Sequence, residues 1–520
     1  AGHRHRALMT ADAAGRPDTR EDIPERIRRA GRVVMVGAAL GVAGQLLFYD
    51  VGLGINFPIA ILLLLGGAWT ARRPGTRPSL VDAWLGPAAI VFAAFAALRS
   101  DATLLMLDVL AALALSGAAI ATLGGREVVR QPLGSIVRTG FAVAGWVGGG
   151  AVAALAGARR ALPATRRTRD QAGPTVPILR GLLLAAPILV VFVTLFASAD
   201  PIFARTVEDL VGLDLDLGDL TGRLVLASAI AWIATGSVAL AASSPPAPAT
   251  SPVRWALPWR LGATEAVTIL VMVNAVFAGF VAVQAAYLFG GLDTMQAIGL
   301  SYAEYARRGF FELVAVAVLA VGLVVALDRL TRTRTSWLIG AGVALMILTG
   351  AVLVSSAVRM RLYQEAYGWT ELRLYVLATI ALLAVVLLAM VAGLLLNRVR
   401  WIGHVAVVAG LVVGVGLNVI GPVRFITEQN VARLADPSLV PEHGTAGLDE
   451  LYLASLGDDA VPGLLRALPL LDAERAEYLT FDLGLRLRHL REPGLEAWQA
   501  WNLGREVARD ALESAAIKLP

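Results

Sequence analysis

Cysteine is absent from this chain of 520 residues, which excludes disulfides, thiolate catalysis and cysteine-ligated metals. Charged residues are scarce, because Asp, Glu, Lys and Arg make up only 16% of the chain, against about 25% in soluble domains. Lysine is almost missing, since Lys518 is its one occurrence, and this bias toward arginine is typical of a bacterium with a GC-rich genome. The net charge of +5 is modest, and we expect no nucleic-acid partner.

Apolar sequence is abundant: hydrophobic residues make up 57% of the chain, and the mean hydropathy is +0.68. Runs of about 18 apolar residues match the ~30 Å hydrocarbon core of a membrane at ~1.5 Å per helical residue. Strand-like alternation is absent, so helices must satisfy the backbone in lipid. The sequence therefore predicts an all-α fold, a polytopic transmembrane helical bundle of about eleven spans. The apolar runs lie at 33–48, 55–70, 83–98, 103–122, 179–198, 224–242, 266–288, 310–327, 337–357, 374–396 and 401–420.

Whether a weaker apolar run at 139–157 spans the membrane can be judged from the arginines in the loops. Arginine is enriched in the cytoplasmic loops of membrane proteins. If this run does not span, about nineteen arginines fall in inner segments and about eight in outer segments. If it does span, the arginines that follow it face outward and every later loop changes side. We therefore predict that 124–178 is an inner-face segment in which 139–157 forms an interfacial or re-entrant hairpin. The outer segments are then 49–54, 99–102, 199–223, 290–308 and 359–373.

Three regions follow from this topology. Residues 1–32 are polar and predict a flexible cytoplasmic arm, residues 33–422 form the transmembrane domain, and residues 423–520 form a soluble, extracytoplasmic helical domain. The N-terminus is then cytoplasmic and the C-terminus extracytoplasmic, in a bacterial cytoplasmic membrane. In the C-terminal domain we expect Asp459 and Asp472 to be helix N-caps. The helices expected there are 449–456, 460–471, 473–490 and 496–515.

Polar residues inside apolar runs are costly in lipid and are the first candidates for function. Asp108 is either a buried proton or ion site or a residue near the outer end of a helix that starts late. Asn274 lies deep in its run, where an interhelical hydrogen bond is the expected role, and Asn418 is interpreted in the same way. His404 is expected to be an interfacial residue. The sequence contains no metal-ligand spacing, phosphate-binding loop or nucleophile elbow, so we predict no catalytic residues, no metal and no cofactor.

Two segments on the predicted outer face, 301–313 and 361–373, are rich in Tyr, Glu and Arg. This composition suggests an outer-face pocket for a polar or lipid headgroup. The alternative is a mesh of hydrogen bonds that locks helix ends, with Glu312 and Glu371 each three residues after a glycine N-cap. The candidate site residues are Asp200, Tyr302, Glu304, Tyr305, Arg307, Arg308, Arg361, Tyr363, Glu365 and Tyr367.

Several motifs resemble a known group. They are Tyr-Ala-x-Tyr-x-Arg-x-Gly-Phe-x-Glu-Leu at 302–313, Leu-Tyr-x-x-Ala-Tyr-Gly-x-Thr-x-x-Arg at 362–373, and shorter pieces at 198–203, 459–465 and 498–505. From about residue 33 onward, the chain resembles the bacterial multi-pass membrane proteins of the domain-of-unknown-function 4153/4173 family. The resemblance implies the multi-pass architecture and brings no activity with it.

Three functions remain open at this level. Transport, or the handling of lipids or small molecules from an outer vestibule, is the leading hypothesis, with membrane lipids as partners. In the vestibule, segments 198–203, 302–313 and 361–373 would lie together under the C-terminal domain. The alternative is a non-enzymatic envelope scaffold or signalling protein with a protein partner at that domain. Enzyme activity is less expected, and the form considered is a transferase that uses Asp200, Glu304 and Arg307.

Overall fold

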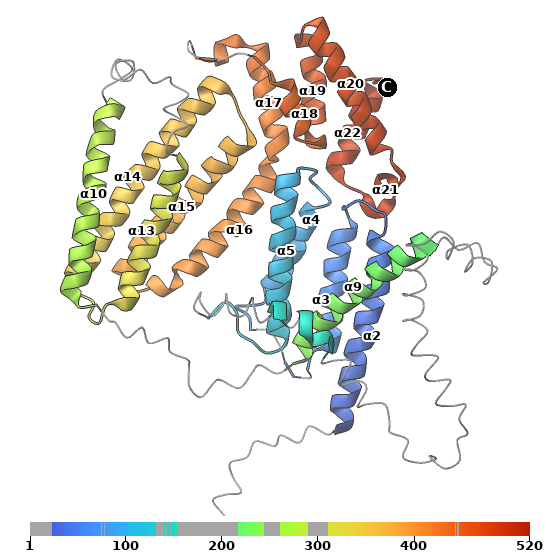
Figure 1. Cartoon of the computed structure of the whole chain (residues 1–520), viewed down its shortest axis with the longest axis horizontal. Coiled ribbons are helices and arrows are strands. Elements are labelled where there is room, and N and C mark those ends of the chain that lie inside the picture. Colours follow the sequence, from blue (N-terminus) through green and yellow to red (C-terminus); the bar gives the residue numbers. More distant parts are fainter. Residues whose placement is uncertain are drawn as a thin grey trace, which may run out of the picture.

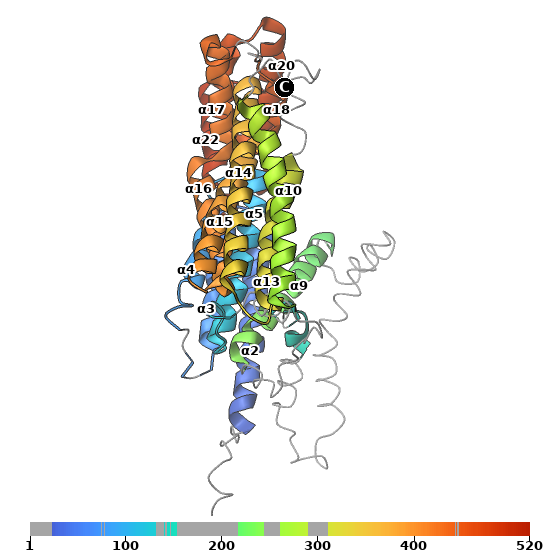
Figure 2. The same ribbon diagram turned by 90° about the vertical axis from the view of Figure 1, so that its left-hand side faces the viewer.

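The computed structural model is all-helical where it is described, apart from an isolated bridge between Leu261 and Thr331. Figure 1 shows two groups of long helices joined by a diagonal helix, with shorter helices at one end. Figure 2 shows that the long helices share one general direction and that the C-terminal helices occupy one end of them. The structure describes residues 23–73, 75–76, 79–131, 140, 143–145, 147–152, 217–243, 261–289, 310–441, 444 and 447–519.

The first group of helices surrounds a core of small and aromatic side chains that includes Phe57, Ala89 and Phe92. Glycines of α2 lie against α9, which runs antiparallel to it. A Cβ atom added at Gly41 would lie 2.6 Å from the carbonyl oxygen of Ala227, so only glycine permits this close approach. The helices are α2 (Ile23–Phe48), α3 (Asn56–Ala71), α4 (Leu85–Phe95), α5 (Ala102–Leu123) and α9 (Leu217–Ala242).

The second group packs around larger side chains, among them Leu345, Met346 and Met390, which are at most 2% exposed. Its last helix, α16, starts with Ile402 in this core, whereas its later Leu411 and Val415 pack against the first group. One helix therefore joins the two groups, as Figure 1 shows. The helices are α10 (Ala263–Phe289), α13 (Phe310–Leu330), α14 (Ser336–Tyr367), α15 (Glu371–Leu395) and α16 (Ile402–Ile420), with the 3-10 turn η1 (Val399–Trp401) before α16.

The C-terminal helices have a leucine-rich core of their own, which also takes in Leu374 of α15. Gly421, at φ 66°, turns the chain directly from α16 into the first of them. The elements are α17 (Pro422–Ala435), η2 (Pro437–Leu439), α18 (Glu450–Ser455), η3 (Asp458–Ala460), α19 (Val461–Ala467), η4 (Leu468–Leu470), α20 (Ala473–Leu490), α21 (Pro493–Glu496), η5 (Trp498–Ala500) and α22 (Leu503–Ser514).

The ends of the long helices define two faces. We call the end that meets α17–α22 the C-terminal face; segments 49–55, 96–101 and 368–370 lie there. The opposite face carries 124–131 and 396–401. Helices α5 and α9 both end at the opposite face, where Arg126 at the end of α5 donates to the carbonyl oxygen of Leu240 in α9.

Within the described residues, eight helices are long and apolar enough to cross a membrane. The prediction of an all-α, multi-pass membrane protein is therefore confirmed. Helices α3 and α4 match predicted runs but contain only 16 and 11 residues. The predicted run at 179–198 lies outside the described residues, so the count of about eleven spans stays a prediction. The same holds for the prediction that 139–157 does not span.

Several predicted boundaries were wrong. Residues 23–32, assigned to a flexible arm, are helical and belong to α2. Segment 359–373 is not a loop, because α14 continues to Tyr367 and Gly368, at φ 80°, then ends it. At ~1.5 Å per residue, the 32 residues of α14 are about 18 Å longer than the hydrocarbon core. Helix α22 begins at Leu503 rather than at residue 496, because Asn502 is its N-cap.

Candidate functional site

An acidic side chain lies among the membrane-spanning helices near the C-terminal face. Asp108 is in α5, seven residues after the N-cap, which places it roughly 10 Å along the helix. Its side chain is 1% exposed, and its Oδ1 accepts a hydrogen bond of 2.8 Å from Nδ2 of Asn418 in α16. The same Nδ2 donates to the carbonyl oxygen of Gly414 at 3.1 Å. Asp108 is thus buried among the helices, in the half of α5 nearer the C-terminal face, and its role as a proton or ion site stays a prediction.

The Asp108–Asn418 pair is left with two oxygens that have no donor. Among the described residues, neither Oδ2 of Asp108 nor Oδ1 of Asn418 has a hydrogen-bond partner, although both atoms are buried. No described arginine, lysine or histidine forms an ion pair with Asp108. A buried carboxylate without a counter-charge is costly, and buried acceptors without donors add to that cost. The arrangement therefore suits a species that brings positive charge or a donor, such as a proton or a small cation.

A second buried carboxylate caps the helix that carries Asp108. Asp101 is 1% exposed and is the N-cap of α5, with Oδ1 accepting from the amides of Thr103 and Leu104 at 2.9 and 3.1 Å. Its Oδ2 accepts from the hydroxyl of Tyr375 in α15 at 3.3 Å. Burial raises the pKa of Asp101, while the two amide hydrogen bonds act in the opposite direction. This cap fixes the start of α5 against α15.

The C-terminal helices close over the same helix start. Asp459, predicted to be an N-cap, instead lies within η3, and its Oδ2 accepts from the backbone amide of Ser100 at 3.2 Å. That prediction was wrong because a tertiary contact takes the carboxylate that a local cap would use. Burial raises the pKa of Asp459, and the charge of Asp101 raises it further, whereas the hydrogen bond from Ser100 lowers it.

Asn502 is the second anchor of the C-terminal helices. Its Nδ2 donates to the carbonyl oxygens of Ala96 and Arg99 at 2.9 and 2.8 Å, and its Oδ1 accepts from the amide of Arg505. The backbone continues the contact, because the amide of Leu503 donates to the carbonyl oxygen of Ala97 at 2.8 Å. Asn502 is 3% exposed, so these bonds are shielded from water.

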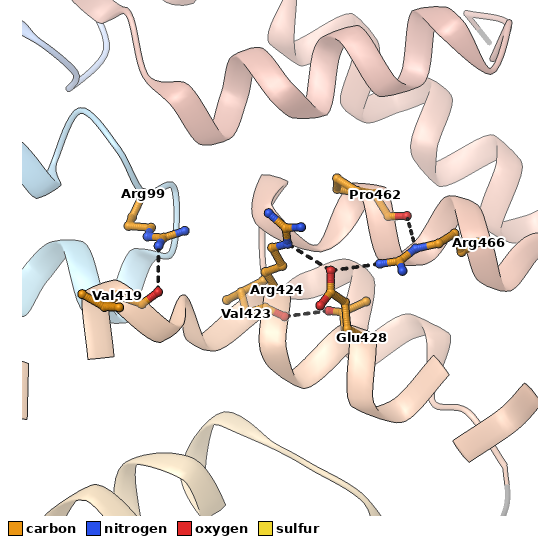
Figure 3. Close-up of polar contacts among 8 residues, drawn as sticks. Arg99, Val419, Val423, Arg424, Glu428, Pro462 and Arg466 are labelled. Carbon is orange, nitrogen blue, oxygen red and sulfur yellow. Dashed lines mark hydrogen bonds and ion pairs between the residues drawn. The ribbon is translucent and has the colours of Figure 1, made fainter. Parts of the chain in front are cut away.

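Arg99 links the turn before α5 to the end of α16. Its Nε and Nη2 donate to the carbonyl oxygen of Asn418 at 3.0 and 2.6 Å, and Nη2 reaches Val419 at 3.5 Å. Figure 3 shows this side chain extending from the turn to the helix end. It also shows Glu428 of α17 between Arg424 and Arg466, with an ion pair of 3.0 Å to each. Asn418 is therefore held at its side chain and at its carbonyl group.

Four of the candidate outer-face residues lie on the last turns of α14. Arg361 and Glu365 form an ion pair of 3.1 Å, and the rings of Tyr363 and Tyr367 lie 5.1 Å apart. Arg373 lies 4.2 Å from the Tyr363 ring centre. Two of these contacts lie within α14 and the third joins it to the first turn of α15, as expected of a mesh that locks helix ends. A role in binding a ligand stays a prediction.

The same turn is joined to α17 and α18. Arg433 donates to the carbonyl oxygens of Glu365 and Ala366 at 2.6 and 3.2 Å, and the amide of Glu371 donates to the hydroxyl of Tyr452 at 2.8 Å. The N-cap of α15 is Thr370, so the expected glycine cap three residues before Glu371 was wrong. Gly368 instead ends α14, because its positive φ suits a helix terminus.

The remaining candidates divide into one described residue and six that are not described. Asn274 of α10 donates to the carbonyl oxygen of Ala341 in α14 at 2.9 Å, which confirms the expected interhelical hydrogen bond. The residues that lie outside the described part are Asp200, Tyr302, Glu304, Tyr305, Arg307 and Arg308. The side chain of Glu312 is not described either. The predicted vestibule is therefore described only at its third segment, 361–373, and at the end of its second, where residues 310–313 begin α13.

Sequence reasoning singled out Asp108 but missed the residues around it. Asp101 had a local signal, because an Asp just before an apolar run is typical of an N-cap. Asn418 was noticed as a hydrogen-bonding residue, without its partner, which is 310 positions away in the chain. Asn502 gave only the local signal of an N-cap.

An apolar hollow of about 190 Å³ lies among α2, α3, α5 and α9, with Leu47, Phe57 and Leu113 in its wall. Its described lining residues have no polar side chain. Such a hollow suits a lipid acyl chain and cannot orient a polar group.

One family model matches the chain. The family is described as "Domain of unknown function (DUF4153)", and the match covers residues 87–467. No curated protein and no solved structure matches. The match includes Asp101, Asp108, Tyr375, Asn418 and Asp459, whereas Asn502 lies beyond its end.

Proposed function

Because the chain belongs to the DUF4153 family, whose description names no activity, we propose a function from the site: proton-coupled transport across the membrane through Asp108 and Asn418. The observation that carries this proposal is the pair of buried acceptor oxygens without donors between α5 and α16. Ionisable residues among membrane-spanning helices are costly and mark proton or ion pathways.

A proton is the occupant that best fits the pair. Protonation of Oδ2 removes the buried charge of Asp108 and turns an acceptor without a donor into a donor. The neighbouring Asn418 supplies Oδ1, an acceptor without a donor. One proton therefore resolves the cost of the charge and supplies a missing donor. Deprotonation restores that cost, so the site favours a different packing of α5 and α16 in each protonation state.

The position of the pair couples it to the C-terminal helices. Asn418 lies near the end of α16, and its carbonyl oxygen accepts from Arg99 in the turn before α5. Asp459 and Asn502 hold that same turn. A change in the packing of α5 against α16 therefore changes the hydrogen bonds that Asp459 and Asn502 make with this turn. The proposed orientation has the C-terminal face outside the cell, because arginine is more abundant in the segments assigned to the opposite face.

The test uses the full chain reconstituted in liposomes that contain a pH-sensitive dye. After an external acid pulse we expect internal acidification with wild type, and its loss with Asp108→Asn, which keeps the side-chain shape but cannot exchange a proton. Asn274→Leu is the matched control, because it removes another buried polar group from the bundle and should keep the flux. Equal acidification with wild type and Asp108→Asn would refute the proposal.

A spectroscopic measurement tests the site without knowledge of the transported solute. Infrared difference spectra of wild type between acidic and basic buffer should contain the C=O band of a protonated carboxyl group in an apolar environment. Asp108→Asn should lack that band, while Asn274→Leu should retain it. A spectrum unchanged by Asp108→Asn would mean that Asp108 does not exchange a proton.

A scaffold function is the second candidate, and the exposed face of α20 favours it. Tyr478, Phe481 and Leu485 are 58%, 55% and 40% exposed, and their spacing places them on one side of the helix. Apolar residues on one helix face suit docking to a protein partner. Site-specific crosslinking at Tyr478 in cells should yield one defined adduct that Phe481→Ser abolishes. An absence of crosslinks would remove this candidate.

A further inference from the structure

A second hollow lies at the opposite face, far from Asp108. Its volume is about 300 Å³, and its described lining residues are Arg130, Gln131, Arg400, Trp401 and His404. It forms where the segment after α5 meets the start of α16. His404 precedes Asn418 by fourteen residues of α16, which is roughly 21 Å along the helix. The hollow is therefore separate from the proposed proton site.

The hollow carries positive charge without compensation. Arg130 and Arg400 are exposed, and within the part of the chain that the structure describes neither forms an ion pair with a carboxylate. No acidic side chain is among the described lining residues. Guanidinium groups bind phosphate oxygens through paired N–H donors, so two of them at one hollow favour an oxyanion.

His404 belongs to the wall of the hollow, beside Trp401. Both of its ring nitrogens are closed to water and have no hydrogen-bond partner among the described residues, so the ring shapes the hollow without donating into it. The ring packs against Trp401, with centroids 4.9 Å apart, and this contact fixes its position. The residue also lies in the first turn of α16, where the helix dipole favours negative charge.

We propose that this hollow binds a phosphate group, held by the guanidinium groups of Arg130 and Arg400. The end of a membrane-spanning helix lies at the depth of lipid headgroups, and Trp401, 37% exposed, is a residue type enriched at that depth. Leu395, the last residue of α15, and Leu396 after it are 64% and 66% exposed and offer an apolar surface for acyl chains. The phosphate then belongs either to an anionic lipid or to a soluble phosphate compound.

The experiment measures binding to the purified full chain. In nanodiscs of phosphatidylcholine with an increasing share of phosphatidylglycerol, the melting temperature should rise and saturate. In nanodiscs of phosphatidylcholine alone, the same measurement is made against inorganic phosphate. The double variant Arg130→Gln/Arg400→Gln should weaken the response at least tenfold. Arg398→Gln is the matched control, since this exposed arginine of the same turn is not among the residues that line the hollow.

The titrations with phosphatidylglycerol and with inorganic phosphate together identify which kind of molecule carries the bound phosphate group. A response to phosphatidylglycerol that free phosphate does not reproduce identifies a lipid headgroup, and a response to phosphate alone identifies a soluble compound. Both support the proposed site only if they depend on Arg130 and Arg400 and not on Arg398. No response in either titration would overturn the proposal, as would equal losses with the double variant Arg130→Gln/Arg400→Gln and with Arg398→Gln. Because Asp108 is not involved, proton flux can fail while this site stands.

Discussion

Asn502 connects the C-terminal helices to the membrane bundle, and its replacement by alanine should detach α22. The substitution removes the N-cap of α22, which costs about 1 kcal/mol. It also leaves the carbonyl oxygens of Ala96 and Arg99 without their donor, at about 1–2 kcal/mol each where water cannot enter. Asn502 is 3% exposed, so the full penalty applies. The expected total is about 3–5 kcal/mol.

Hydrogen exchange measured by mass spectrometry reports this loss directly, because amides of α22 exchange when the helix opens. A loss of about 3 kcal/mol or more accelerates exchange by roughly a hundredfold or more. Asn502→Ser should fall between wild type and alanine, since serine keeps a cap but cannot reach the two carbonyl oxygens. Asp472→Ala is the matched control: Asp472 caps α20 with one exposed bond of 3.0 Å to the amide of Arg475.

For Asp472→Ala we expect a loss of only about 1 kcal/mol, confined to α20. If exchange in α22 of Asn502→Ala stays within about threefold of wild type, the two carbonyl bonds contribute little. The anchoring role assigned to Asn502 would then be refuted. Equal effects of Asn502→Ala and Asp472→Ala on their own helices would lead to the same conclusion.

Three further predictions concern packing, pH and the second helix group. An added Cβ at Gly41 would lie 2.6 Å from a backbone oxygen of α9. Gly41→Leu should therefore lower the free energy of unfolding by about 1–3 kcal/mol or more in detergent titrations. The control Gly66→Leu should not lower it, because the space around Gly66 is open. Burial raises the pKa of Asp459 above its ordinary 3.8, so its contribution to stability is present at low pH and is lost as the pH rises above about 4. The melting temperature of wild type should therefore fall more between acidic and neutral pH than that of Asp459→Asn. Parallel curves for the two proteins would contradict this. Asn274→Leu breaks one interhelical bond to Ala341 and should cost only about 0.5–1.5 kcal/mol in the same titrations, so a loss of several kcal/mol would mean that Asn274 does more than join two helices.

The sequence by itself determined the fold class and the membrane location. Apolar runs long enough for a bilayer leave helices as the way to satisfy the backbone, so each described run forms a helix. Local capping was also readable where no distant partner competes: Asp472 caps α20 as predicted, and Pro462 lies in the first turn of α19. These features depend only on residues that are close together in the chain, so the sequence is enough to predict them.

Tertiary structure decided which polar residues meet. Asp108 was recognisable as an unusual residue, but its partner Asn418 lies on a helix that crosses from one helix group to the other. Asp459 fits the local pattern of a cap, and only the approach of Ser100 explains why it does not act as one. Apolar periodicity determines that a helix is buried, while the helix that it contacts depends on the packing of the whole bundle. A site built from residues hundreds of positions apart therefore exists only in the folded chain, because distances between helices are not encoded by local spacing.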